Sequence, residues 1–150
     1  MPARHLVDLT WPEVAEVASS TLLAVPLGAT EQHGPHLPIG TDTTIATALA
    51  DRLSEARPDV IVAPAVAYGS SGEHAGFAGT ISIGGPATSN VVVELVRSAD
   101  AFRGVVLVSG HGGNAEAVRS AVATLAGEGR DVLAWSPSVP AGDAHAGRTE

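Results

Sequence analysis

The segment from Glu31 to Asp42 carries three side chains whose types and spacing suit a metal site. Residues two apart in an extended segment point to the same side, so Glu31 and His33 can face one point. Asp42 comes back at the mouth of the helix that we expect next. Two carboxylates and an imidazole are ligands that zinc, iron and manganese accept. The alternative is a polar loop in which Glu31 and Asp42 only cap neighbouring backbone amides.

His111 lies between glycines, directly after a continuous apolar run, and is a further candidate ligand. Small neighbours leave its imidazole accessible to an ion. Two other interpretations stay open at this point. One is a glycine-rich turn with an incidental histidine, and the other is a phosphate-binding turn, because Gly112 and Gly113 precede a helix N-terminus. The dinucleotide fingerprint and the lysine of a P-loop are both missing from the sequence, which ranks phosphate binding last.

A third polar cluster follows the last apolar run and contains Asp143, His145 and Glu150. An imidazole titrates near neutrality, so His145 could act as a proton shuttle. Spacing alone favours a solvated tail over this role.

Four further residues in loops are candidate substrate contacts: His36, Glu73, His74 and Phe77. His36 follows a Gly-Pro pair and could orient a metal ligand from behind it. The other three share a loop with four glycines and could line a substrate pocket. Ordinary loop residues would give the same pattern.

Alternating strands and helices must position these groups. Apolar runs predict strands over 22–27, 60–66, 80–83, 105–108 and 132–135. A short helix is predicted at the capping box Thr10–Glu13. Longer helices are predicted from Thr43 to just before Pro58, from near Pro86 to Ala99, and after Asn114 as far as Gly127. This order indicates an α/β fold with a mostly parallel sheet. Ligands bind beyond the carboxyl ends of such strands, where both 31–42 and 109–114 fall.

The composition limits the class of protein further. The 150 residues fit a single domain, 1–150, and a formal net charge of −8 without a Lys/Arg cluster argues against nucleic-acid binding. Cysteine does not occur, so a metal site must be built from histidine and carboxylates. No apolar run has the form of a signal peptide or the length of a membrane span. We therefore expect no membrane partner and a cytoplasmic location.

Three ordered motifs resemble the creatininase (creatinine amidohydrolase) family. The first is LGATEQHGPHLP at 27–38, followed by Thr41-Asp42. The second is GHGGN at 110–114, and the third begins with HAG at 145–147 and Thr149-Glu150. The resemblance covers residues 10–150. It implies a three-layer α/β/α fold, two divalent metal ions (Zn, Fe or Mn) and assembly as a homo-oligomer, commonly a hexamer.

The resemblance also implies how the two ions are held. Glu31, Asp42 and His111 would bind one ion. His33, Asp42 and a further carboxylate would bind the other, so that Asp42 bridges the pair.

The further carboxylate and a proton donor are expected from the third motif. Creatininase itself supplies this carboxylate from its second motif, where the present chain has Gly113, so the matching candidate is Glu150. His145 matches a histidine implicated in proton transfer. Glu150 and His145 are therefore the expected catalytic residues. The third motif of the family continues beyond the glutamate, so we expect the chain to be truncated at its C-terminus.

Within the family, the run YGSSGEHAGFAGTISI at 68–83 is similar to the members of the mycofactocin system. This likeness implies a metal-dependent peptidase that removes a modified C-terminal Val-Tyr dipeptide from a small precursor peptide. One alternative is hydrolysis of creatinine or a formamide by the same chemistry. Another is a non-catalytic metal-binding or assembly subunit.

Overall fold

Four parallel strands form the centre of the structure, a computed structural model that describes residues 1–138. Their order in the sheet is β2 (Val60–Val62), β1 (Leu22–Leu27), β3 (Gly104–Ser109) and β4 (Val132–Trp135). Every pairing is parallel, and Leu22 is aligned with Val60 on one side and with Gly104 on the other. The predicted parallel sheet is therefore confirmed.

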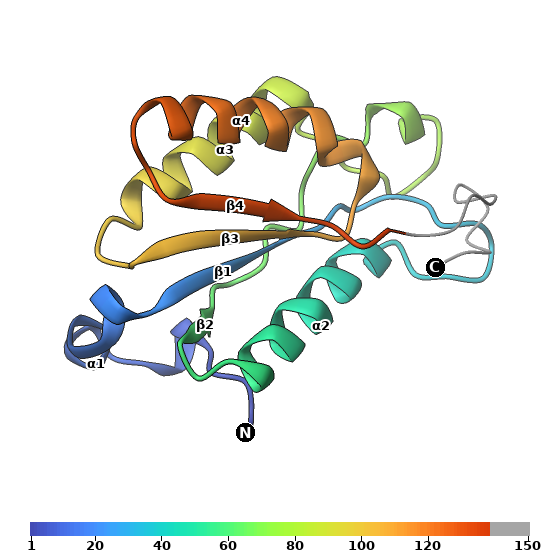
Figure 1. Ribbon diagram of the computed structural model, residues 1–150. Helices are drawn as coiled ribbons and strands as arrows, with labels where there is room; N and C mark the ends of the chain where they lie inside the picture. Colours follow the sequence, from blue (N-terminus) through green and yellow to red (C-terminus); the bar gives the residue numbers. More distant parts are fainter. Residues whose placement is uncertain (139–150) are drawn as a thin grey trace.

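Helices cover both faces of the sheet (Figure 1). α2 (Thr41–Ala56) lies on one face, and α3 (Gly85–Ser98) and α4 (Ala115–Gly127) lie together on the other. α1 (Trp11–Val17) precedes β1, and the Glu13 carboxylate accepts the Thr10 N–H at 2.7 Å, as the capping box predicts. Short 3-10 turns lie between these elements: η1 (Leu6–Asp8), η2 (Ala18–Ser20), η3 (Gly72–His74) and η4 (Gly112–Asn114). The three-layer α/β/α architecture is confirmed.

Apolar side chains at alternate strand positions build a core on each face of the sheet. On one face, Leu23, Val25 and Leu27 of β1 pack with buried residues of α3 and α4. On the other face, Ala24 packs with Ala50, and these small side chains let α2 approach the strands closely. Of the helices within residues 1–138, none is both long and apolar enough to span a membrane.

The strand order reverses at β1, which places the carboxyl ends of β1 and β3 side by side. The chain leaves β1 through α2 to reach β2, whereas β3 lies on the opposite side of β1. Open α/β sheets bind ligands at such switch points. The Gly110 N–H donates to the Leu27 carbonyl at 2.9 Å and joins the two loops that carry the candidate ligands.

One predicted strand is shorter than expected, and another does not form. β2 ends at Val62 instead of residue 66. The Ala63 N–H still donates to the Ala24 carbonyl at 2.8 Å, but Pro26 of β1 has no N–H to donate to the Ala63 carbonyl in return. Val66 makes only an isolated bridge to the end of β1. Residues 80–83 form no strand, since Ile81 alone makes an isolated antiparallel bridge.

The helix after the first motif begins at Thr41, two residues earlier than predicted. The Thr44 N–H donates to the Gly40 carbonyl at 3.0 Å, which closes the first turn ahead of Thr43. Asp42 consequently lies inside the first turn of α2, where the exposed N–H groups of a helix favour a negative charge.

Close packing of α2 against the end of β3 leaves no room for a side chain at Gly110. A Cβ built there would lie 2.9 Å from the Ala46 nitrogen and would overlap the Asp42 carbonyl oxygen. We expect Gly110→Ala to lower the free energy of unfolding by about 1–3 kcal/mol, the usual cost of overpacking. Urea unfolding measures this, with Gly127→Ala as the control because nothing lies within 4 Å of a Cβ at Gly127. If Gly110→Ala and Gly127→Ala unfolded at the same urea concentration, this packing would be contradicted.

Candidate metal centre

The Asp42 carboxylate lies between two imidazoles in the interior of the protein. His33 Nε2 is 2.7 Å from Asp42 Oδ1, and His111 Nδ1 is 2.8 Å from Asp42 Oδ2. The loop after β1, the first turn of α2 and the turn after β3 supply one of these residues each. All three side chains are buried, so water screens their interactions weakly.

Backbone carbonyls fix the orientation of both imidazoles. His33 Nδ1 lies 3.1 Å from the Glu31 carbonyl oxygen, and His111 Nε2 lies 2.9 Å from the Ser70 carbonyl oxygen. A carbonyl only accepts, so in each neutral ring this nitrogen carries the proton. His33 Nε2 and His111 Nδ1 then present lone pairs to Asp42. Lone pairs that face a carboxylate require a cation between them, either a proton or a metal ion.

Glu31 adds a second buried carboxylate next to His111. One ligand atom from each of Glu31, Asp42 and His111 lies within 4.8 Å of the other two. Glu31 Oε2 and Asp42 Oδ2 are buried and make no hydrogen bond. Burying a carboxylate oxygen without a partner is costly, and coordination of a cation offsets that cost. The donor set therefore fits a divalent metal ion.

Neighbouring charges shift the titration of His111. Burial lowers the pKa of this imidazole, but the hydrogen bond that the protonated ring can donate to the Asp42 carboxylate, the Ser70 carbonyl and the charges of Glu31 and Asp42 together outweigh it. The net pKa lies above the ordinary value for histidine. The cavity thus favours a positive charge between His111 and Asp42, where a metal ion would also bind.

The structure brings four of the five predicted metal ligands together. Glu31, His33, Asp42 and His111 line one cavity of about 380 Å³. The fifth ligand, Glu150, lies outside the described residues, and so does His145, the other residue predicted to be catalytic.

Two of the four predicted substrate contacts line the same cavity, namely Glu73 and His74. Phe77 is 55% exposed, and its ring contacts the His74 ring with centroids 6.3 Å apart. His36 is also exposed and is not among the residues within 1–138 that line the cavity.

Two residues that support the site, Ser70 and Asn114, were not predicted. Asn114 is 1% exposed, its Oδ1 accepts the Ser70 N–H at 3.0 Å, and its Nδ2 donates to the Gly28 carbonyl at 3.0 Å. Asn114 therefore joins the end of β1 to the loop whose Ser70 carbonyl orients His111. Its place in the same short motif as His111 is the one sequence signal for this role.

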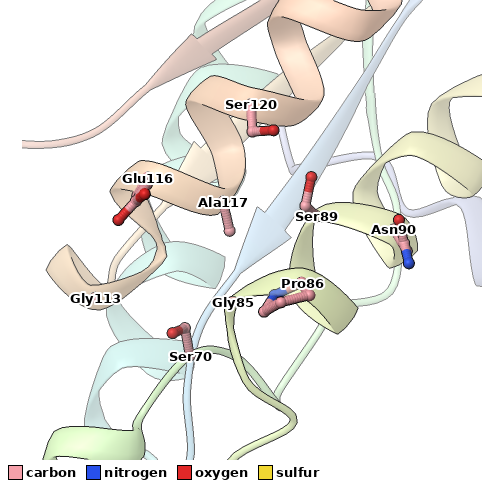
Figure 2. Close-up of a pocket in the computed structure, with 9 residues that line it drawn as sticks. All are labelled: Ser70, Gly85, Pro86, Ser89, Asn90, Gly113, Glu116, Ala117 and Ser120. Atoms are coloured by element: carbon pink, nitrogen blue, oxygen red, sulfur yellow. The ribbon is translucent and has the colours of Figure 1, made fainter.

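A second cavity, of about 490 Å³, opens between α3 and α4 beside the metal cavity (Figure 2). Gly113 lines both cavities. A Cβ on Gly113 would lie 2.5 Å from the Ser70 carbonyl oxygen and would overlap His111 Nε2, so the wall between the cavities must be bare backbone. Apart from one acid, the lining of the second cavity is uncharged: Ser70, Gly85, Pro86, Ser89, Asn90, Gly113, Glu116, Ala117 and Ser120.

Comparison with known proteins agrees with the motifs. Residues 7–150 match the creatininase family, described as creatinine amidohydrolase. The chain belongs to the creatininase family. Two creatininase-family relatives are a protein named mycofactocin precursor peptide peptidase from Mycolicibacterium smegmatis and the creatinine amidohydrolase of Pseudomonas putida. The first is 55% identical, and the match covers 86% of this chain and 55% of the relative's length. The second is 35% identical, and the match covers 69% of this chain and 43% of the relative's length.

Solved creatininases share the fold. A manganese form of creatininase superimposes with a TM-score of 0.75 at 29% identity, covering 89% of this chain and 58% of that one. The chain thus spans little more than half the length of the Mycolicibacterium relative and of this creatininase.

Proposed function

We propose that this creatininase-family protein is a metal-dependent hydrolase of amide bonds, and that its substrate is the mycofactocin precursor peptide. The proposed cleavage releases the modified C-terminal Val-Tyr dipeptide that the sequence resemblance implies. One observation carries the proposal: Asp42 lies between the lone pairs of His33 and His111, beside an unpartnered oxygen of Glu31. The name of the Mycolicibacterium relative supports the choice of a peptide as the substrate.

We assign the ligands to two sets that share Asp42. Glu31, Asp42 and His111 would hold one ion, which is consistent with the short distances among their ligand atoms. His33 and Asp42, together with Glu150 from outside the described residues, would hold the other. Zinc, iron and manganese all accept oxygen and imidazole ligands. When bound, such ions supply Lewis acidity at an amide carbonyl and lower the pKa of water.

His33 and His111 cannot serve as proton donors to the substrate. The Nδ1 proton of His33 and the Nε2 proton of His111 are held by backbone carbonyls, and the opposite nitrogens face Asp42. A separate group must therefore pass a proton to the leaving nitrogen, and we propose that His145 does so.

The cavities give room for a peptide on both sides of Gly113. We propose that Glu73 and His74 in the cavity wall, together with Phe77 and His36 outside it, contact the substrate. The cleft between α3 and α4, whose lining is uncharged apart from Glu116, would hold the part of the peptide that does not react.

Hydrolysis assays on the metal-loaded chain test the proposal. We expect the chain with Zn²⁺ or Mn²⁺ to cleave the precursor peptide, a chelator to abolish cleavage, and added metal to restore it. Cleavage of creatinine or a formamide, without cleavage of the peptide, would show that the substrate is one of these small amides and not the precursor peptide. Metal binding without turnover of any of the three substrates would indicate a non-catalytic metal-binding subunit.

We also propose that the protein assembles as a homo-oligomer, a hexamer by family resemblance, in the cytoplasm. Both proposals rest on the sequence. Light scattering coupled to size-exclusion chromatography measures the assembly, and a monomer at micromolar concentration would contradict it.

A further inference from the structure

Gln32 lies between two proposed metal ligands in the sequence, and its side-chain amide has a defined orientation. Its Oε1 accepts the Gly34 N–H at 2.8 Å. A backbone N–H only donates, so this contact decides which end of the amide is the oxygen. The amide nitrogen then lies at the other end, where it is 3.0 Å from His74 Nδ1.

The orientation of Gln32 sets the tautomer of His74. The amide nitrogen is a donor, so Nδ1 of His74 accepts, and the proton of the neutral ring lies on Nε2. His74 is buried at 6% exposure on η3, where its backbone N–H donates to the Ser71 carbonyl at 3.0 Å. Contact with the Phe77 ring further limits its rotation.

The protonated Nε2 of His74 faces the Glu31 carboxylate. It lies 3.5 Å from Glu31 Oε1 and 3.6 Å from Glu73 Oε1. The Glu73 side chain is 57% exposed, so water screens its charge, whereas the Glu31 side chain is only 6% exposed. Glu31 is therefore the stronger partner of the His74 Nε2–H.

The two oxygens of Glu31 consequently have different surroundings. Oε1 faces the His74 donor, while Oε2 lies 3.3 Å from His111 Nε2 and makes no hydrogen bond. The N–H of His74, 3.5 Å from Oε1, attracts that oxygen and so orients the carboxylate with its other oxygen toward an ion.

We infer that His74, aligned by Gln32, is a positioning residue that orients Glu31 for metal binding. This inference rests on the metal site of the proposed function but does not require that the protein hydrolyse a peptide.

Nitrogen NMR of the imidazole rings tests the tautomer directly. In the metal-free chain we expect His74 Nε2 to show the shift of a protonated nitrogen and Nδ1 the shift of an unprotonated one. Addition of Zn²⁺ should leave the Nε2 proton in place. A proton on Nδ1, or loss of the Nε2 proton when Zn²⁺ binds, would overturn the inference, because His74 would then be unable to donate to Glu31.

Zn²⁺ affinity, measured by calorimetry, tests the effect on the site. We expect His74→Leu and Gln32→Glu to weaken binding about 10- to 100-fold, the usual range for groups that orient a ligand. Gln32→Glu keeps the shape of the side chain but replaces the donor with an acceptor. His74→Gln should restore most of the affinity, because its amide nitrogen can donate to Glu31.

The matched control is His5→Leu, the same substitution at a histidine that contacts Asp51 away from the cavity. It should leave Zn²⁺ affinity unchanged. Wild-type affinity in a folded His74→Leu variant, or equal losses in His74→Leu and His74→Gln, would overturn the inference. If the wild-type chain bound Zn²⁺ but did not hydrolyse the peptide, while the variants lost affinity as expected, the proposed function would be contradicted and this inference would stand.

Discussion

Asp42→Asn is expected to abolish peptide hydrolysis and to weaken Zn²⁺ binding by more than about 100-fold, beyond the range for groups that only orient a ligand. Asp42 is the residue that both imidazoles face, so both proposed ligand sets lose a charged member at once. The amide has nearly the shape of the carboxylate but not its charge, so the change isolates the electrostatic contribution. Calorimetry with Zn²⁺ and the hydrolysis assay measure the two effects.

The same variant should fold at least as stably as the wild type when both are metal-free. The amide nitrogen can donate to one of the imidazole lone pairs, whereas the carboxylate leaves Oδ2 without a hydrogen bond. Sites built to bind a cation commonly reduce the stability of the empty protein. Urea unfolding in the presence of a chelator measures this.

Asp51→Asn is the matched control for Asp42→Asn, because it makes the same change on the same helix, α2. Asp51 lies near His5, outside the metal cavity, and the variant should keep wild-type Zn²⁺ affinity. Equal losses of affinity in the two variants would show that negative charge on α2, rather than coordination by Asp42, attracts the ion.

Gly113→Ala is expected to weaken Zn²⁺ binding by about 10- to 100-fold. This is the usual effect of removing a group that orients a histidine ligand. Its Cβ would press on the His111 ring and on the Ser70 carbonyl, the two partners of the hydrogen bond that directs His111 Nδ1 toward Asp42. Calorimetry with Zn²⁺ measures the change, and circular dichroism checks that the variant folds.

Gly112→Ala is the control for this variant, because nothing lies within 4 Å of a Cβ at the neighbouring position. It should bind Zn²⁺ like the wild type. If both variants bound Zn²⁺ equally well, the orientation of His111 by Ser70 would not matter to the site.

The sequence predicted the fold well where local signals were strong. Leu22–Leu27 and Val132–Trp135 were predicted with the observed bounds, because each is an uninterrupted apolar run flanked by polar residues or turn-forming residues. The strand predicted over 60–66 extends only to Val62, because the apolar run does not reveal that Pro26 of the neighbouring strand has no N–H to continue the ladder. The start of α2 was missed because Gly40 closes the first turn without a side-chain cap.

The approach of the metal ligands to one another was predictable from topology, but the contacts that orient these ligands were not. Residues at the carboxyl ends of adjacent parallel strands meet at one edge, so the approach of Asp42 and His111 followed from the strand order. The contacts of Ser70 with His111 and of Gln32 with His74 join positions about 40 residues apart through loops, and loops have no periodic signal. Such contacts depend on how the loops fold, which the sequence pattern does not specify.

Anomalous diffraction from crystals of the Zn²⁺-loaded protein, recorded at the zinc edge, tests the central claim most directly. We predict two peaks about 3.5–4 Å apart, one on each side of the Asp42 carboxylate. One peak should lie within bonding distance of Glu31 and His111, and the other within bonding distance of His33. A zinc ion bound elsewhere, with no peak in contact with Asp42, would contradict the account.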